Sequence, residues 1–449
     1  MFEKIHATLA DLRNLFAGRA TSAEEERAAA HLLDCRSCRL LAVRAIAAQE
    51  ALGGIRVSGS LRTLADFLSN EKIRLAEGLE AQAAWAAIRP LSPKARRDKV
   101  RLARNLHTLP FLKTLLEAGT TAGTATESEE ILQLALLVAG QLPATDHPSE
   151  IKNDYCAECC AEIANARRRQ ANWLTARDSL KKGDQHSKHG LRNGVAEARL
   201  LCVGGAIEFD LGNPEEAAKI LRRAAALFEA NGEIFLQSRT LAQLAYTLVE
   251  VAPAESLQLV EGALELIPAE HPRLALFAEG IRIDCLLEIG APGEAMMRFE
   301  AQEGLFAEFR EPFIQLRRWF TAARIMDRLQ FPRQAERLFH DVIAGDLEHG
   351  MMKDFFLDLV DLLSFYLRRG QKQDAIEVCR RALQELRPQD DDGGGEASRE
   401  QMREVWRDLE EAIKKGQVDL GVPAVLRSYI KAHWRTPAPE PPSFTAGEE

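Results

Sequence analysis

The sequence predicts an all-α protein whose main part is a solenoid of stacked helical hairpins. Nearly every segment between residues 126 and 390 is rich in Ala, Leu, Glu and Arg, which favour helices. No convincing segment alternates apolar and polar residues in the manner of a strand. A turn-like cluster also returns at a nearly constant interval, which indicates a structural repeat.

The recurring turn has a Gly or an equivalent residue, followed five positions later by a small residue. The four clear copies are Leu211–Ala217, Ile289–Ala295, Leu329–Ala335 and Arg369–Ala375. Two weaker copies fit the same frame, at Ala171–Ala176 and Val251–Ser256, and Glu129–Leu142 reads as a further half-copy. The frame positions are therefore 171, 212, 251, 290, 330 and 370, which are 39 to 41 residues apart.

Each copy is interpreted as the junction between a helix A and a helix B. The Gly can end helix A with a positive φ, and the Pro that often follows suits the first turn of helix B. The small residue lets the two helices approach closely. A single hairpin cannot bury both of its faces, so we expect neighbouring hairpins to stack into a right-handed superhelix.

These Gly-x-Pro-x-x-Ala turns resemble the junction between the two helices of the tetratricopeptide repeat family. The period of about 40 residues exceeds that family's usual period of about 34, which implies longer helices, and the family's aromatic signature positions are weak here. An irregular helical bundle and a HEAT-like array, whose period is also near 40, are the alternatives.

A metal site is predicted near the N-terminus by the motif His31-Leu-Leu-Asp-Cys35-Arg-Ser-Cys38. It follows a helix start in which Ser22 can act as the N-cap and Glu25 can complete a capping box. His31 and Cys35 are four residues apart and lie on one helix face, and Cys38 comes one turn later. Three such ligands suit Zn²⁺.

The best fourth ligand is His6, on a preceding helix expected at about Phe2–Phe16. The set His6, His31, Cys35 and Cys38 resembles the zinc-binding anti-sigma domain family, with its H-x3-C-x2-C signature and an upstream ligand. The resemblance implies one closed, structural zinc ion, held by neutral imidazoles and thiolates. It also implies a sigma factor of the extracytoplasmic-function type as partner. The segment Leu61–Ile88, which would correspond to a sigma-contacting helix, can instead join the solenoid.

Composition then divides the chain into five parts. We expect a zinc-binding helical domain at residues 1–52 and linkers with connecting helices at 53–128, including a flexible connector at 118–128. The solenoid is expected at residues 129–390. A capping segment at residues 391–434 follows it and contains the helices Ser398–Lys415 and Pro423–Trp434. The last part is a disordered, Pro-rich tail at residues 435–449.

Three other patterns have ordinary interpretations. Cys156, Cys159 and Cys160 are expected to pack as small apolar residues inside a helix, although metal or redox chemistry is the alternative. His186 and His189 are placed in a solvated turn at Gly183–Gly190. The Arg clusters, which recur in several repeats, are interpreted as cations at helix C-termini, or as a basic stripe in the groove that receives an acidic peptide or, less often, nucleic acid. They are Arg167–Arg169, Arg222–Arg223, Arg317–Arg318 with Arg324 and Arg328, and Arg368–Arg369 with Arg380–Arg381.

Composition also narrows the class of protein. A net charge of −9 argues against a protein that coats nucleic acid. No apolar run reaches the roughly 18–20 residues that span a bilayer, and the charged N-terminus lacks the apolar region of a secretory signal. We therefore expect a cytoplasmic protein without membrane insertion, whose eight cysteines stay reduced. The sequence contains no Walker loop, dinucleotide fingerprint, nucleophile elbow or H-E-x-x-H motif.

The leading functional prediction is a non-enzymatic, regulatory interaction scaffold in a bacterial cytoplasm, which binds a protein or peptide in the solenoid groove. The alternative is a zinc-dependent anti-sigma factor. A third possibility is an enzyme that uses the zinc. Such an enzyme needs an open coordination position on the metal, which requires that His6 is not a ligand. A zinc domain that only caps the solenoid is the fourth possibility.

Overall fold

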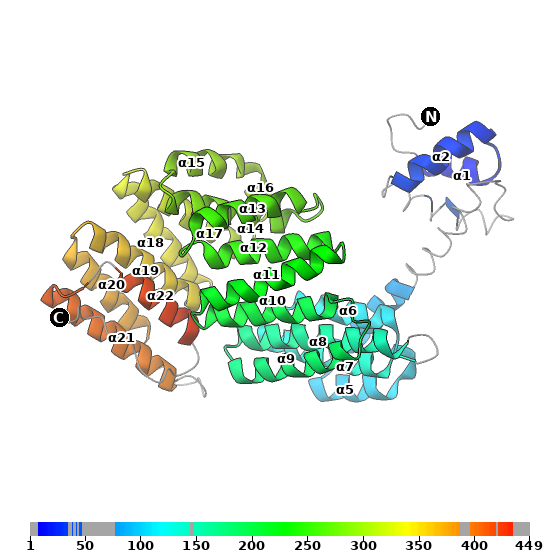
Figure 1. Cartoon of the computed structure of the whole chain (residues 1–449), viewed down its shortest axis with the longest axis horizontal. Coiled ribbons are helices and arrows are strands. Elements are labelled where there is room, and N and C mark those ends of the chain that lie inside the picture. The colour runs from blue at the N-terminus through cyan, green and yellow to red at the C-terminus, as the bar shows by residue number, and fades with distance from the viewer. Residues whose placement is uncertain are drawn as a thin grey trace. The chain divides into compact units, whose positions relative to one another are not determined.

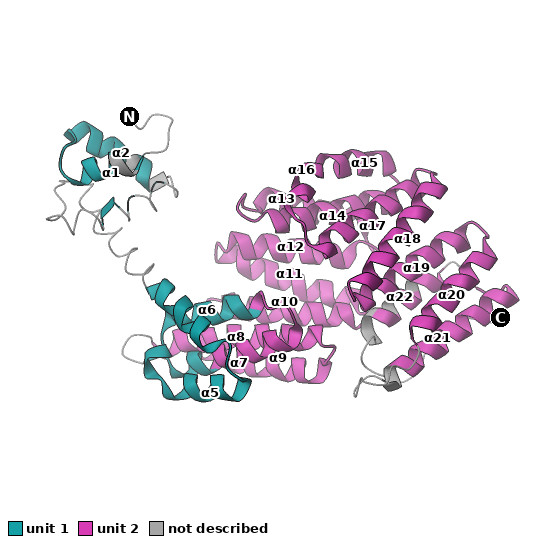
Figure 2. Cartoon of the chain, turned by 180° about the vertical axis from the view of Figure 1, so that it is seen from behind, with its two compact units in different colours: residues 1–119, 137–143 teal, residues 120–136, 144–449 magenta. Residues whose placement is uncertain are grey.

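The computed structural model describes residues 8–34, 38, 42, 45–46, 77–143, 148–386, 396–418 and 421–433 (Figure 1). Within these ranges the chain is helical and contains no strand, which confirms the all-α fold class. None of the described helices is long and apolar enough to cross a bilayer. The chain forms two compact units, residues 1–119 with 137–143 and residues 120–136 with 144–449 (Figure 2).

The helices of the first unit are short. They include α1 (Leu9–Phe16), α2 (Ser22–Asp34), α5 (Pro93–Leu102), the 3₁₀ helix η1 (Arg104–Leu106) and α6 (Leu109–Thr120), and residues 77–88 are helical as well. The next helix, α7 (Ala125–Gln141), has its residues divided between the two units.

Two expectations for this region were wrong in detail. The capping box of α2 uses Thr21 and Glu24 instead of Ser22 and Glu25, because the backbone N–H and the hydroxyl of Thr21 both donate to the Glu24 carboxylate, at 2.8 and 2.9 Å. The connector expected at 118–128 is mostly helical, since α6 ends at Thr120 and α7 begins at Ala125. The Ala and Thr residues of this connector are compatible with helix ends.

The second unit contains six consecutive helical hairpins. Their first helices are α8 (Ser149–Arg169), α10 (Val195–Asp210), α12 (Ile234–Leu248), α14 (Pro272–Glu288), α17 (Pro312–Arg328) and α19 (Met352–Arg368). Their second helices are α9 (Trp173–Lys188), α11 (Pro214–Ala230), α13 (Pro253–Leu266), α15 (Pro292–Ala301), α18 (Pro332–Glu348) and α20 (Lys372–Glu385). A short helix, α16 (Glu303–Glu308), lies between the fourth and fifth hairpins.

The turn inside five of the six hairpins has the backbone that the repeat frame predicts. Five of the six frame positions adopt a positive φ, and they are Ala171, Gly212, Gly290, Gln330 and Gly370, at 55° to 83°. Val251 is the exception. A β-branched residue is strained in the left-handed region, and here α12 ends at Leu248 and Pro253 opens α13.

The small residue five positions later is fully buried in every hairpin. Its solvent-exposed fraction is 0% at all six positions, which are Ala176, Ala217, Ser256, Ala295, Ala335 and Ala375. Ser256 satisfies its hydroxyl by donating to the carbonyl of Ala245 at 2.7 Å. A larger side chain at these positions would push the paired helices apart.

The C-terminal helices α21 (Glu396–Lys415) and α22 (Val422–His433) pack on the sixth hairpin. Trp406 of α21 is fully buried against Phe356 of α19, with ring centroids 6.4 Å apart. Leu426 and Ile430 of α22 are buried in the same core. Helix α22 also contacts α10 of the second hairpin, so the superhelix turns back towards its beginning (Figure 1).

Ala335→Leu is expected to lower the free energy of unfolding by about 1–3 kcal/mol, because the added atoms overpack the junction between α17 and α18. Gln334→Leu, at the exposed neighbouring position, is the control and should change stability by no more than about 0.5 kcal/mol. Urea unfolding followed by circular dichroism measures both variants. Equal midpoints for the two variants would contradict the packing role of the frame position.

Candidate functional site: a cleft lined by the first helices of the hairpins

Three adjoining hollows lie along the first helices of the hairpins, and we name them together the inner cleft. Their volumes are about 450, 380 and 410 Å³. Tyr246 of α12 lines all three. Phe209 is shared by the first and third hollows, and Phe320 by the first and second. The hollows are therefore neighbouring parts of one surface.

Helices that are distant in sequence line this surface together. Glu162 of α8 and Asp354 of α19 both line the third hollow, so the first and last hairpins face the same space. Pro423 and Arg427 of α22 line the first hollow. The cleft thus has the concave position that a stack of hairpins creates.

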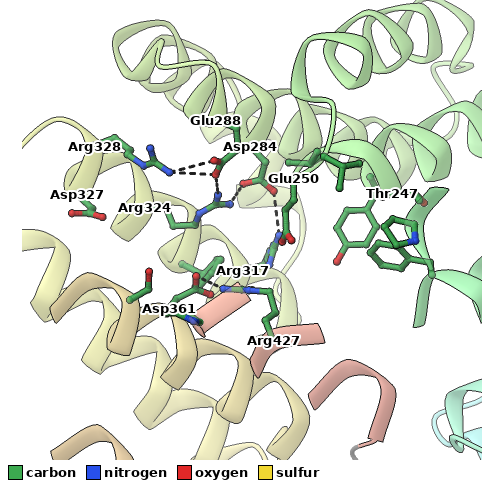
Figure 3. Close-up of a pocket in the computed structure, with 18 of the residues that line it drawn as sticks. Thr247, Glu250, Asp284, Glu288, Arg317, Arg324, Asp327, Arg328, Asp361 and Arg427 are labelled. Atoms are coloured by element: carbon green, nitrogen blue, oxygen red, sulfur yellow. Dashed lines mark hydrogen bonds and ion pairs between the residues drawn. The ribbon is translucent and has the colours of Figure 1, made fainter. Parts of the chain in front are cut away.

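Ion pairs join successive first helices along the cleft, at spacings close to one repeat period. Arg199 of α10 reaches Glu158 of α8 at 2.9 Å. Arg368 of α19 reaches Asp327 of α17 at 2.7 Å. Arg324 of α17 binds both Asp284 and Glu288 of α14 (Figure 3). These pairs bridge neighbouring hairpins.

These ion pairs correct the interpretation of the Arg clusters. Several of these arginines do stand in the last turns of α8, α17 and α19, as predicted, but arginines of these helices also bind carboxylates of adjacent hairpins. The first hollow is lined by five arginines and five carboxylates, so it is not a basic stripe. The carboxylates are Glu250, Asp284, Glu288, Asp327 and Asp361, and the arginines are Arg317, Arg324, Arg328, Arg368 and Arg427.

The side chain of Arg427 enters the cleft from α22 and pairs with Asp361 of α19 (Figure 3). Burial opposes the charged guanidinium, but the carboxylates of Asp361, Glu250 and Asp358 together outweigh burial and raise the pKa of Arg427. A segment outside the six hairpins therefore supplies a cation to the carboxylates of α19.

The second hollow has a different character, because aromatic rings form much of its wall. Tyr246, Phe277, Phe306, Phe313 and Phe320 all line it. Phe277 and Phe313 remain exposed, with exposed fractions of 46% and 56%. Exposed aromatic side chains in a concave surface are typical of binding sites.

Besides Asp284, which pairs with Arg317 and Arg324, three aspartates line the same hollow. Asp346 is 1% exposed and Asp358 is 9% exposed, while Asp354 is half-buried. Burial raises the pKa of all three carboxyls, and it raises that of Asp346 to about 6. Asp346 and Asp358 share a hydrogen bond, and the repulsion between their charges raises the pKa of Asp358 further. The pair is thus arranged to hold a proton between two oxygens.

The charged groups that face these three carboxyls are few. Arg317 of α17 lowers the pKa of Asp354 and of Asp358, and Lys353 also lowers that of Asp354. His349 lowers, and Asp354 raises, the pKa of Asp346.

No partner-binding residue was predicted from the sequence, although the sequence does carry a signal for one. Asp354, Asp358 and Asp361 are spaced by four and three residues on α19, and so lie on one helix face. The rest of that helix is strongly apolar and aromatic, with Phe355, Phe356 and Phe365 fully or nearly fully buried. A row of acids on an otherwise buried helix indicates a functional face.

Two of the four predicted zinc ligands lie within the described residues. The Nε2 atom of His31 is 3.3 Å from the Sγ atom of Cys38. Tetrahedral zinc, with Zn–N of about 2.0–2.1 Å and Zn–S of about 2.3 Å, places such a pair about 3.5 Å apart, so this contact fits. His6 and Cys35 lie outside the described residues, as do the residues before Thr8. The four-ligand site therefore stays a prediction.

The remaining cysteine and histidine patterns are structural where they are described. Cys159 and Cys160 are buried inside α8, and burial raises the pKa of both thiols, that of Cys160 to about 11. The expected turn at residues 183–190 was wrong, since α9 continues to Lys188 and includes His186. That imidazole contacts the Oδ1 atom of Asn153 at 3.0 Å.

Asp346→Asn is expected to stabilise the protein at pH 7.5 by about 1–3 kcal/mol. A folded-state pKa above the unfolded value means that the ionised carboxylate costs stability, fully so above about pH 6. The gain should therefore shrink as the pH falls from 6 towards 4. Urea unfolding at pH 7.5 and 4.5 measures it.

The matched control is Asp341→Asn, an exposed carboxylate on the same helix, α18. It should give no comparable gain at either pH. A destabilised Asp346→Asn variant at pH 7.5 would contradict the assigned cost of the buried charge.

No protein-family model and no curated protein sequence matches the chain. Among solved structures, the chain is similar to the crystal structure of a Rap protein complexed with Competence and Sporulation Factor. The TM-score is 0.53 at 14% sequence identity, and the match covers 73% of this chain and 86% of that chain. At this identity the likeness shows the fold alone, which is a tetratricopeptide-like helical repeat.

Proposed function

We propose that this protein is a non-enzymatic scaffold that binds an extended peptide segment of a partner in the inner cleft. The observation that carries the proposal is the continuity of the three hollows, which meet at Tyr246. A concave surface built from repeated helices is suited to an extended ligand, because successive hairpins present successive side chains.

The fold comparison supports this proposal. The similar Rap structure contains a bound Competence and Sporulation Factor, so a helical repeat of this kind accommodates a ligand. The two chains match over most of their lengths. A regulatory role for the present protein is part of the proposal.

The chemistry of the cleft favours a peptide over nucleic acid. Phosphate groups require an excess of cationic side chains, and the first hollow balances its arginines with carboxylates. The second hollow adds exposed Phe277 and Phe313. A surface with both charges and aromatic rings suits a peptide that carries charged and apolar side chains.

The cysteine of the cleft is also suited to packing instead of covalent catalysis. Cys202 lines the third hollow, and its Sγ atom is 3.2 Å from the Thr240 hydroxyl. Burial raises the pKa of this thiol, whereas a nucleophilic cysteine needs a lowered pKa. This supports a binding role over an enzymatic one.

We further propose that the N-terminal domain binds one structural zinc ion through His6, His31, Cys35 and Cys38. The His31–Cys38 contact of 3.3 Å supports it. When bound, zinc would supply cross-linking to a domain with a small core, while His31 and Cys38 hold positions on and just beyond α2. The anti-sigma alternative rests on the resemblance of this motif alone, and the cytoplasmic location rests on the sequence.

Gly280→Trp is expected to abolish peptide binding while leaving the fold intact. Gly280 of α14 lines the second hollow, and a side chain there meets nothing within 4 Å. The probe is a phage-displayed library of random dodecapeptides, selected on the full-length protein. Wild type should enrich a related set of sequences, and Gly280→Trp should lose them.

Gly262→Trp is the matched control, because this helical glycine on α13 also faces open space but lines none of the three hollows. It should select the same peptides as wild type. Peptides that bind Gly280→Trp as strongly as wild type would place binding outside the second hollow. A wild-type chain that enriches no sequence would overturn the proposed function.

His31→Ala/Cys38→Ala is expected to remove the zinc. The full-length wild type should carry about one zinc ion per chain by elemental mass spectrometry after dialysis, and this variant should carry close to none. His186→Ala/Cys156→Ala, which removes the same residue types from the solenoid, should retain it. Zinc-free wild type prepared from zinc-supplemented cultures would refute the metal proposal.

A further inference from the structure

We propose that the carboxylate end of the second hollow binds a lysine or arginine side chain of the peptide ligand. This inference rests on the proposed function and names the chemistry of its partner. The residues that would receive the cation are Asp346, Asp354 and Asp358, with Phe277 and Phe313 alongside.

The first observation is an incompletely satisfied buried carboxylate. Asp346 is 1% exposed and lines the hollow, yet its Oδ2 atom has no hydrogen-bond partner among the described residues. Buried polar atoms are normally paired, because an unpaired one costs about 1–3 kcal/mol. A donor group arriving in the hollow would satisfy this oxygen.

The second observation is that these three carboxyls, two of which share a proton, have no ion-pair partner among the described residues. Within the described chain, Asp346, Asp354 and Asp358 form no ion pair with an Arg or Lys nitrogen within 4 Å. The hollow's two arginines bind elsewhere, since Arg273 pairs with Glu311 and Arg317 with Asp284.

The third observation is that the walls suit a cation with an apolar stem. The Arg317 guanidinium already lies over the Phe320 ring, 5.0 Å from its centroid. Phe277 and Phe313 present further exposed rings in the same hollow. Lysine and arginine combine an apolar chain with a charged head, and aromatic rings attract that head.

The same face of α19 already binds a cation from another segment. Arg427 of α22 pairs with Asp361, which follows Asp358 by one helical turn. A guanidinium carried on a separate helix is therefore accommodated in this cleft. At the neighbouring position Arg427 acts on Asp358 only from a distance, and its direct ion pair is with Asp361, so Asp354 and Asp358 can receive a further cation.

A metal ion is a poorer occupant of this end of the hollow. Calcium and magnesium take six or more oxygen ligands, several of them commonly water, in a hydrated site. Here the carboxylates are set among Phe306, Phe313 and Phe320. Aromatic walls favour an organic cation.

The test compares three full-length proteins in the same dodecapeptide selection. They are wild type, Asp354→Asn/Asp358→Asn, and the control Asp178→Asn/Asp341→Asn, which removes the same number of carboxyl groups at exposed positions outside the cleft. Circular dichroism and thermal unfolding confirm that each variant is folded. The readout is the frequency of lysine and arginine at each position of the selected peptides.

The proposal expects wild type and the control to select peptides with a recurrent lysine or arginine, and the cleft variant to lose that preference. Selected peptides without this preference, or a preference unchanged in the cleft variant, would overturn the inference and leave the proposed function standing. Failure of wild type to select any sequence would overturn both.

A second measurement has its decisive comparison on wild type alone. Calorimetric titration compares the best selected peptide with a copy in which its lysine or arginine is replaced by norleucine. The replacement should weaken binding to wild type about 10-fold or more, as for the loss of a charge-assisted hydrogen bond. The two peptides should bind the cleft variant with affinities within about 2-fold. Equal affinities for wild type would refute the cation site.

Discussion

The structure depends on the close approach of the two helices within each hairpin. This approach is possible because a fully buried alanine or serine stands at the same place in all six hairpins. Each hairpin is then thin enough to stack on the next, and stacking buries the faces that one hairpin leaves exposed. A displacement at one junction, such as that at Ala335, would move the first helix of its hairpin. Since those helices form the cleft, the packing of the outer helices also positions the binding surface.

The repeat period fixes the electrostatics as well as the packing. Residues one period apart stand opposite each other on neighbouring first helices, and this brings Glu158 to Arg199 and Asp327 to Arg368. Most charges in the cleft are therefore occupied in joining one hairpin to the next. Carboxylates that do not join two hairpins are therefore candidates for ligand binding. On α19, Asp361 pairs with Arg427, while Asp354 and Asp358 face the hollow. Burying such carboxylates costs stability, and residues that cost stability are often retained because they bind a ligand.

The N-terminal domain follows a different principle, because its proposed stabilisation is local. His31 of α2 and Cys38 are seven residues apart in the sequence, and their side chains lie in contact. A metal site of this kind can cross-link a small helical domain that has little core. The solenoid does not need such a cross-link, since its hairpins are stabilised by their neighbours.

The sequence by itself determined the features that are set by local chemistry. The helical class, the hairpin frame, the positive φ at Gly212 and Gly290, and the burial of the small residues all follow from residue types within one turn. The capping box of α2 was displaced by one residue, because Thr21 and Ser22 are chemically equivalent caps.

Only the tertiary structure decided which charges meet. The Arg clusters were interpreted from their own helix ends, whereas their partners stand on the next hairpin, as with Arg324 and Asp284. The return of α22 to α10, and the gathering of Asp346 and Asp358 beside Phe313, join residues from separate helices. Such contacts depend on the rotation between successive hairpins. That rotation is the sum of many packing contacts, and no single motif in the sequence specifies it.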